Sequence, residues 1–184
     1  MLALRNAAST FAYRILGAAV LDRSVLEGIE HDPAATRQAA LVIIGSAVAA
    51  GVGASGWNGP SPVVLLGVAG LALVTWVAWA AIILHIGGRS LPEAGTHVDL
   101  GQLLRTIGFA ASPGFLQVFA CLPGMTTAVF VASWVWMLAA MTVAVRQALD
   151  FRSMRRAVAV CGLALGLVLA MAWFLAMLLI TAVV

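Results

Sequence analysis

Charged residues are scarce in this 184-residue chain, and lysine is absent altogether. Only 9% of the residues are charged, whereas 63% are apolar and the mean hydropathy is +1.07. This composition excludes a soluble globular protein, because the chain has too little polar material to cover a folded core. The chain is therefore predicted to be an integral membrane protein.

Ionisable residues are missing from three long stretches: no Asp, Glu, Lys or Arg occurs in 38–84, 106–145 or 157–184. Proton relays, ion pathways and voltage sensors need such groups inside the bilayer. The main polar side chains there are those of Gln117, Ser112, Ser133, Thr75 and Thr142. They suit hydrogen bonds between helices better than ion coupling, so a small-molecule transporter component is the less favoured alternative.

Catalytic groupings are also missing from the sequence pattern. We find no strong pair of carboxylates, no nucleophile with a base and no glycine loop that would cradle a phosphate. We expect no enzyme activity, no cofactor, no bound metal and no nucleic acid partner. Cys121 and Cys161 are predicted to lie at opposite ends of their helices, which makes a disulfide between them geometrically implausible.

The uncharged stretches predict an all-α fold with five transmembrane helices. A bilayer core about 30 Å thick needs roughly 20 helical residues, so the first two stretches can each cross twice and the third once. Turn-forming residues break them at Gly56–Pro62 and at Leu122–Gly124. The predicted spans are 36–56, 62–85, 102–122, 125–146 and 156–183.

The arginines provide an independent prediction of orientation, because short loops rich in Lys and Arg stay in the cytoplasm. All of them fall on one side of the predicted bundle, so we expect a cytoplasmic N-terminus and a C-terminus outside. The arginines expected at the membrane interface are Arg37, Arg105, Arg146, Arg155 and Arg156.

Residues 1–35 are predicted to form an N-terminal amphipathic or interfacial segment before the five-span domain, 36–184. They do not resemble a secretory signal, since Arg14 interrupts the apolar run. Apolar residues at Leu4, Ala8, Phe11 and Ile15 follow helical spacing. We favour a helix that lies in the cytoplasmic interface; the alternative is a helix that packs on the bundle or on a partner.

Two helix starts are predicted after this segment. Asp22 or Ser24 is expected to cap a short helix over 21–29. Asp32 followed by Pro33 is typical of the start of a further helix, which would lead into the first span.

Small residues recur every four positions in the first and last spans, where they would let helix backbones approach closely. The residues concerned are Gly45, Ala49 and Gly53 in the first span, and Gly162, Gly166 and Ala170 in the last. Packing within the chain and dimerisation both fit this pattern, and we favour packing within the chain.

Most tryptophans lie away from the predicted outer interface. Trp76, Trp79, Trp134, Trp136 and Trp173 are therefore interpreted as packing or ligand-facing residues, whereas Trp57 alone lies where an aromatic belt is expected.

The third predicted span contains Ser112-Pro113-Gly114. Proline removes a backbone donor from a helix, and within a membrane the freed carbonyl must find another partner. The sequence therefore predicts a kinked or broken third helix that packs against protein rather than lipid.

His85, at the end of the second span, is a ligand candidate. Its spacing from Ala81 resembles the bacteriochlorophyll-binding helices of light-harvesting polypeptides, in which a histidine ligates magnesium. An interfacial or loop-bonding histidine is the alternative, and we predict no pigment. Glu93, His97 and Asp99 are expected to lie in a solvated loop rather than in a metal site.

Three segments together resemble the Yip family of Ypt/Rab-interacting membrane proteins, in its bacterial form. They are Leu103–Gly124, with its arginine and buried proline, Ser133–Val160, with its tryptophans and basic turn, and Leu26–Val42 before the first span. The resemblance implies five spans, a cytoplasmic N-terminus and a C-terminus outside. The chain has Phe109 where tyrosine is common, and it lacks the extended N-terminal domain of the eukaryotic trafficking members, so a Rab-type GTPase is not an expected partner.

Function and location follow as expectations. The absence of lysine and the abundance of Ala, Gly, Val and Arg suggest a GC-rich bacterial genome, and so a multi-pass protein of the bacterial cytoplasmic (inner) membrane. We expect a non-catalytic scaffold or membrane-organising protein of the Yip type, in contact with the lipid bilayer and other membrane protein subunits. The alternative is an accessory subunit of a larger respiratory or photosynthetic complex.

Overall fold

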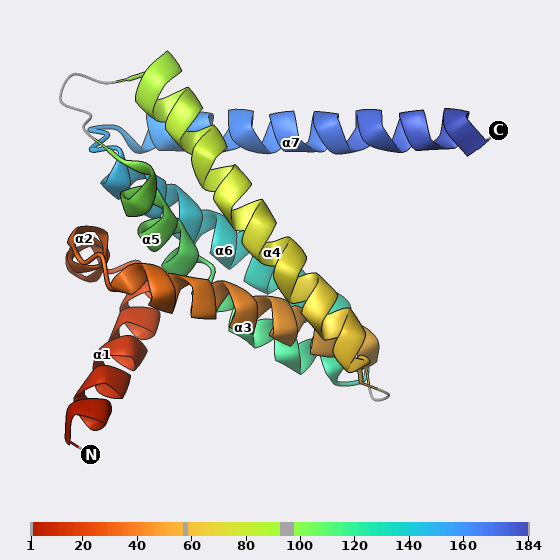
Figure 1. The fold of residues 1–184 in the computed structure, drawn as a ribbon, viewed down its shortest axis with the longest axis horizontal. Helices are drawn as coiled ribbons and strands as arrows, with labels where there is room; N and C mark the ends of the chain where they lie inside the picture. Colours follow the sequence, from red (N-terminus) through yellow and green to blue (C-terminus); the bar gives the residue numbers. More distant parts are fainter. Residues whose placement is uncertain (1, 57–58, 93–97, 184) are drawn as a thin grey trace.

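The computed structural model describes the backbone of residues 2–56, 59–92 and 98–183, and every regular element in these ranges is helical (Figure 1). The elements are α1 (Leu2–Ala19), α2 (Arg23–His31), α3 (Ala35–Ser55), α4 (Pro62–Ile83), the π-helix η2 (Leu84–Ser90), α5 (Leu100–Ala110), the 3-10 helix η3 (Ser112–Cys121), α6 (Thr126–Ala148) and α7 (Met154–Val183).

Four helical segments among the described residues are long and apolar enough to cross a membrane. They are Ala35–Ser55, Pro62–Ser90, Leu100–Cys121 and Thr126–Ala148. Their positions confirm the first four predicted spans to within a few residues. The fifth predicted span falls in α7, whose C-terminal side chains lie outside the described residues, so its crossing stays a prediction.

The segment formed by α5 and η3 is the centre of the bundle. In its most apolar window 72% of the residues are buried, compared with 11% in the segment of α4 and η2. Helices α3 and α6 contact η3, and α4 packs on α3 and α5. The third span is therefore enclosed by protein, whereas the outer helices present apolar faces such as Leu66 and Val74 of α4.

Helix α7 leaves this bundle soon after it begins (Figure 1). Its first turns pack against the core through Ala157, Val160 and Ala164. Beyond Ala164 no described residue of α7 is buried, and Trp173 and Phe174 are 66% and 58% exposed. One end of α7 is thus a core element, and the described side chains beyond Ala164 are not enclosed by the rest of the bundle.

The N-terminal helix α1 packs on the bundle, which is the placement that the sequence analysis did not favour. Phe11 of α1 meets Phe109 of α5 edge-on, with ring centroids 6.2 Å apart. Ala18 is fully enclosed, and Trp136 of α6 donates its indole N–H to the carbonyl of Ala19 at 2.7 Å. Helix α2 enters the same core through Leu26 and Ile29, so both N-terminal helices share the hydrophobic core of the spans.

Asp22 is the residue that caps α2. Its carboxylate accepts from the backbone N–H groups of Ser24 and Val25, which have no partner within the first turn of a helix. The hydrogen bond from the Ser24 hydroxyl is the main cause that lowers the pKa of Asp22.

Candidate functional site at the polar end of the bundle

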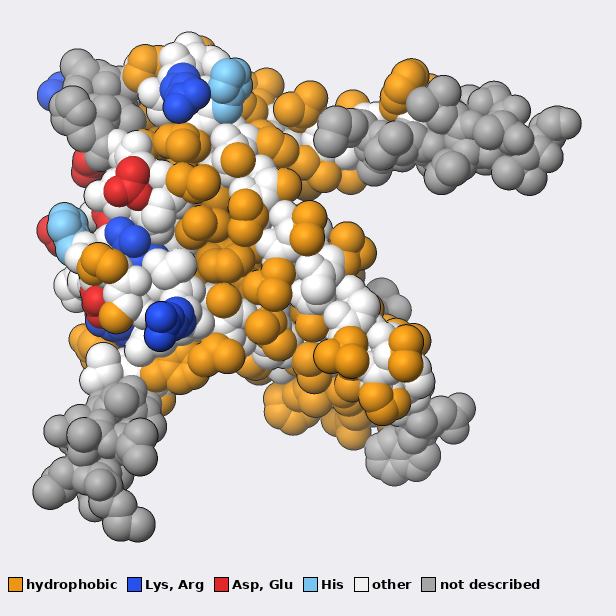
Figure 2. Space-filling view, in the orientation of Figure 1, with side chains coloured by type: hydrophobic (Ala, Val, Ile, Leu, Met, Phe, Trp, Pro, Cys, Tyr) orange, Lys and Arg blue, Asp and Glu red, His pale blue; other side chains and the backbone are white. Residues whose placement is uncertain are grey.

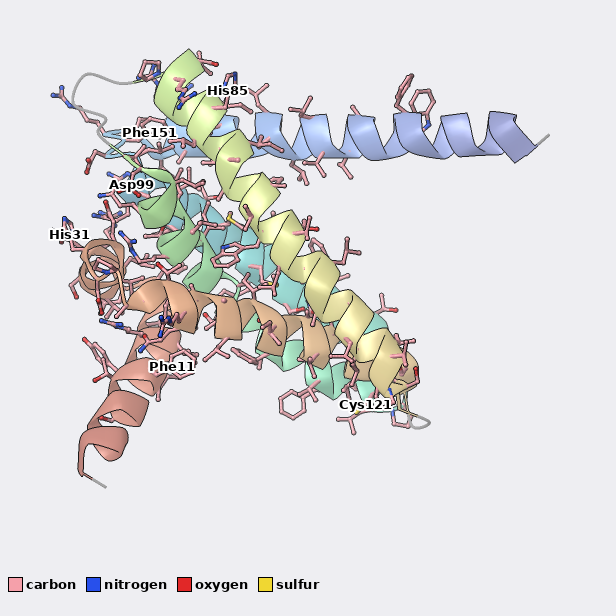
Figure 3. All side chains as sticks on the ribbon, viewed as in Figure 1. Phe11, His31, His85, Asp99, Cys121 and Phe151 are labelled. Carbon is pink, nitrogen blue, oxygen red and sulfur yellow. The ribbon has the colours of Figure 1, made fainter. Side chains whose placement is uncertain are left out.

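Charged side chains gather at the end of the molecule that carries α2, the start of α5 and the turn between α6 and α7, which we call the polar end (Figure 2). Hydrophobic side chains cover most of the remaining visible face. His31, Asp99 and Phe151 lie at this end, and Cys121 lies at the opposite end (Figure 3). Cys121 and Cys161 are both free thiols.

Arg105, which is predicted to lie at the membrane interface, is buried by protein at the polar end. The residue is 8% exposed, and its Nε and Nη2 atoms donate to the backbone carbonyl of Glu30 at 3.0 and 2.6 Å. That carbonyl belongs to the last turn of α2, where helical carbonyls lack intrahelical partners and a cation is favoured. The arginine therefore joins the central helix to α2.

Arg14 holds a second link, which sequence reasoning missed. Its guanidinium donates to the Asp32 carboxylate at 2.6 Å and to the Gln38 amide oxygen at 2.8 Å. Asp32 also accepts from the backbone N–H of Ala34 just before α3. The hydrogen bond from Arg14 is the main cause that lowers the pKa of Asp32. The interruption of an apolar run by Arg14 was the available signal.

Glu30 and His31, the last two residues of α2, differ in burial. Glu30 is 5% exposed, and burial raises the pKa of its carboxyl group because the charged form loses solvation. His31 is exposed, and the contact of its Nδ1 with the Glu27 carbonyl raises its pKa. The shift of Glu30 follows from its burial in the bundle, whereas that of His31 arises within α2 itself.

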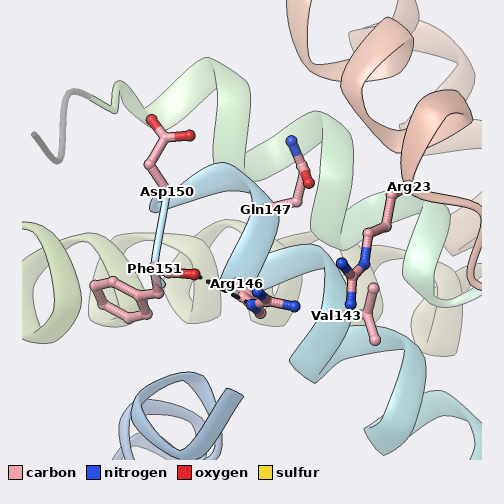
Figure 4. Close-up of a pocket in the computed structure, with 6 residues that line it drawn as sticks. All are labelled: Arg23, Val143, Arg146, Gln147, Asp150 and Phe151. Carbon is pink, nitrogen blue, oxygen red and sulfur yellow. Dashed lines mark hydrogen bonds between the residues drawn. The ribbon is translucent and has the colours of Figure 1, made fainter. Parts of the chain in front are cut away.

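A cavity of about 180 Å³ opens beside the turn that follows α6 (Figure 4). Its lining residues are Arg23, Val143, Arg146, Gln147, Asp150 and Phe151. Arg146 donates from Nε to the Phe151 carbonyl at 3.1 Å and from Nη2 to the Arg152 carbonyl at 3.2 Å, so the turn holds its guanidinium in place.

The other predicted interfacial arginines differ in exposure. Arg37 and Arg155 are exposed, and Arg156 is half-buried with its guanidinium 5.8 Å from the centroid of the Phe151 ring. Their guanidinium groups add positive charge to the polar end outside the cavity.

The third span is interrupted at the predicted Ser112-Pro113-Gly114 position. Helix α5 ends at Ala110, and the tighter helix η3 begins at Ser112. All three residues are buried, and the Ser46 hydroxyl of α3 donates to the Ala111 carbonyl at 2.8 Å. A neighbouring helix thus supplies a donor at the break, as a buried interruption in a membrane helix requires.

The small residues of α3 lie against this irregular segment. A Cβ atom added at Gly45 would clash with the Phe115 ring, and one added at Gly53 would clash with the backbone carbonyl of Gln117. Ala49, between them, is buried. Close approach of α3 to η3 therefore depends on the missing side chains.

Gly162 and Gly166 correct the prediction of packing within the chain for the last span. Both are exposed, and a Cβ atom added at either would meet nothing within 4 Å. The physical reason is that both glycines lie on the face of α7 opposite to Ala157, Val160 and Ala164, which pack on the core, so no other backbone comes near them.

His85 is an exposed residue of the π-helix η2, and Ala81 is exposed as well. Asp99 caps α5 in a reciprocal arrangement with Gln102, each side chain bonding the other's backbone N–H at 2.8 Å. Glu93 and His97 lie outside the described residues. The described residues contain no cluster of three His, Cys, Asp or Glu side chains suited to a metal ion.

Several apolar membrane-length helices around a buried third span define a multi-pass helical membrane protein. A family model described as the Yip1 domain matches residues 23–179, which is most of the chain, so the protein belongs to the Yip family. Comparisons with curated proteins and with solved structures found no match. Yip proteins are generally non-enzymatic membrane proteins that interact with other proteins.

Proposed function

We propose that this protein is a non-catalytic, membrane-organising scaffold of the Yip type in the bacterial cytoplasmic membrane. In this proposal α7 is the fifth span, the polar end faces the cytoplasm and the C-terminus lies outside. The positive-inside rule supports the orientation, because Arg23, Arg37, Arg146 and Arg155 all belong to the polar end or the elements that meet there.

The observation that carries the scaffold function is the apolar length of α7 that leaves the core. Past Ala164 its described side chains, including Leu167, Leu169 and Trp173, are mostly exposed. A surface of this kind is stable only against lipid or another apolar protein surface. Helix α7 therefore supplies a contact surface, and its first turns join that surface to the bundle.

The topology can be tested with single cysteines in a variant in which Cys121 and Cys161 are replaced by alanine. A cysteine at Ser153 should react from the cytoplasmic side only, and a cysteine at Gly59 should react from the outer side only. Labelling of both positions from one side would overturn the five-span proposal.

The accessory-subunit function remains the second proposal, favoured by exposed tryptophans on the spans. Trp134 and Trp136 of α6 are 55% and 41% exposed. Exposure of an indole to lipid leaves its polar N–H without a hydrogen-bond partner, which is costly unless another protein covers the side chain. The indole N–H of Trp136 donates to the Ala19 carbonyl, but that of Trp134 has no hydrogen bond among the described residues.

Gentle detergent extraction followed by native electrophoresis and mass spectrometry distinguishes the two proposals. Comigration with one larger complex at fixed stoichiometry would favour the accessory subunit and reject a free scaffold. A monomer or a homo-oligomer would reject the accessory subunit.

A further inference from the structure

The cavity at the polar end has the chemistry of an anion site. We propose that it binds a phosphate group, with Arg23 and Arg146 as its cationic ligands and Gln147 as a neutral donor. The inference goes beyond the proposed function, because it concerns a small ligand rather than a partner for the helices.

Arg23 provides the first uncommitted cation. It is the first residue of α2, it is exposed, and its guanidinium has no hydrogen-bond or ion-pair partner among the described residues. The side-chain amide of Gln147, on the last turn of α6, is also without a partner in the described part of the chain. Two donor groups from different helices therefore line one cavity with their hydrogen-bonding capacity unused.

Arg146 provides the second cation, already oriented. Two of its five N–H groups bond the carbonyls of Phe151 and Arg152, which restrains the planar fork before a ligand arrives. Nη1 and the second hydrogen of Nη2 remain for a ligand. A guanidinium held in this way matches the oxygens of a phosphate better than a mobile lysine would.

Asp150 also lines the cavity, and its charge opposes anion binding. Its carboxylate makes no ion pair with either arginine, and it points away from both guanidinium groups in Figure 4. The lining therefore carries two positive charges and one negative charge, and the negative one is not directed at the positive pair. An excess of unpaired positive charge beside a concave surface attracts an anion.

The surroundings of the cavity suit a phosphate that is part of a lipid headgroup. Val143 forms an apolar part of the lining, and the same side of α6 leads two helical turns deeper to the exposed Trp136. Val20, in the turn that Trp136 contacts through Ala19, is 69% exposed. An acyl chain could follow this apolar surface while the phosphate stays between the arginines; a free phosphate would use the arginines alone.

The test is titration calorimetry on the full chain in detergent with soluble short-chain lipids. Dioctanoyl phosphatidylglycerol should bind, and dioctanoyl phosphatidylcholine should bind at least several-fold more weakly, since its choline cation meets two arginines. Arg23→Gln should weaken phosphatidylglycerol binding about tenfold, the loss of one charge-assisted hydrogen bond. The matched control Arg37→Gln removes the same charge from an exposed site outside the cavity and should leave binding unchanged.

Asp150→Asn gives a result that loss of folding cannot imitate. Asn tolerates the left-handed backbone at this position, where φ is 52°, and removal of the carboxylate should strengthen binding about threefold. Competition by excess inorganic phosphate would identify free phosphate as the ligand source, and lack of competition would identify the headgroup.

Equal weakening by Arg23→Gln and Arg37→Gln, equal affinity for the two lipids, or weaker binding by Asp150→Asn would each overturn the proposed site. None of these measurements depends on which side of the membrane the polar end faces, so failure of the topology would be seen separately, in the cysteine labelling.

Discussion

Helices α3 and α7 carry the same pattern of small residues, yet the structure uses it in only one of them. In α3, Gly45 and Gly53 lie so close to η3 that neither position has room for a Cβ atom. In α7, Gly162 and Gly166 face open space. The comparison shows that a ridge of small residues permits close approach but does not choose a partner. Gly45 and Gly53 of α3 pack against the irregular segment η3, which begins at Ser112.

The largest expected effect on stability comes from replacing one glycine of each ridge by leucine. Gly53→Leu should lower the free energy of unfolding by about 3 kcal/mol, because a new side chain must displace the Gln117 backbone. Gly162→Leu should leave it unchanged or raise it by up to about 1 kcal/mol through better helix propensity. Unfolding in detergent titrated with sodium dodecyl sulfate measures both free energies. Equal losses of stability in the two variants would show that the two ridges do not differ.

Pro113→Ala tests whether the break in the third span creates the surface on which α3 packs. Loss of the buried ring removes about two methylene groups, and the straighter backbone would disturb the Ser46 contact, so we expect a loss of about 2 kcal/mol. Circular dichroism should show a gain in α-helix, with cysteine labelling unchanged. An unaltered thermal midpoint in detergent would show that the break has no structural role.

Ser46→Ala isolates a single hydrogen bond between α3 and the break in the third span. The variant removes the hydroxyl donor to the Ala111 carbonyl and should cost about 1 kcal/mol. Ser55→Ala is the matched control, since Ser55 bonds Gly51 of its own helix and no other helix depends on it. A loss for Ser46→Ala no larger than that for Ser55→Ala would mean that the bond between α3 and the break is unimportant.

The smallest expected effect concerns the polar end, where Arg14 ties α1 to the start of α3. The pKa of Asp32 is lowered in the folded protein, so its contribution is present above the unfolded value of 3.8 and is lost as pH falls through the folded value. We expect a loss of at most about 1 kcal/mol in acid, and Arg14→Gln should show the same loss at neutral pH. A pH profile of Arg14→Gln as steep as that of the wild type would contradict this account.

The predicted positions of the first four spans agree with the structure, because the requirement for about 20 apolar residues acts locally on the sequence. Membership of the Yip family is confirmed, although each of the three segments that suggested it is weak evidence by itself. The burial of Arg105 was not predicted, since its partner, the Glu30 carbonyl, is a backbone group that no residue identity reveals. The cavity could not be predicted for a related reason: Arg23 and Arg146 are far apart in the sequence and line the same cavity only in the folded chain.

Composition and the spacing of charges were sufficient to show that this is a membrane protein. The reason is that moving a charged side chain into hydrocarbon is costly in any fold. The order of the helices and the interruption at Pro113 were determined in the same local way. Tertiary structure alone decided which small-residue ridge is filled, which arginine is buried and which arginines share a cavity. Those outcomes depend on the directions in which helices leave their turns, and a direction is set by the summed packing of the whole bundle.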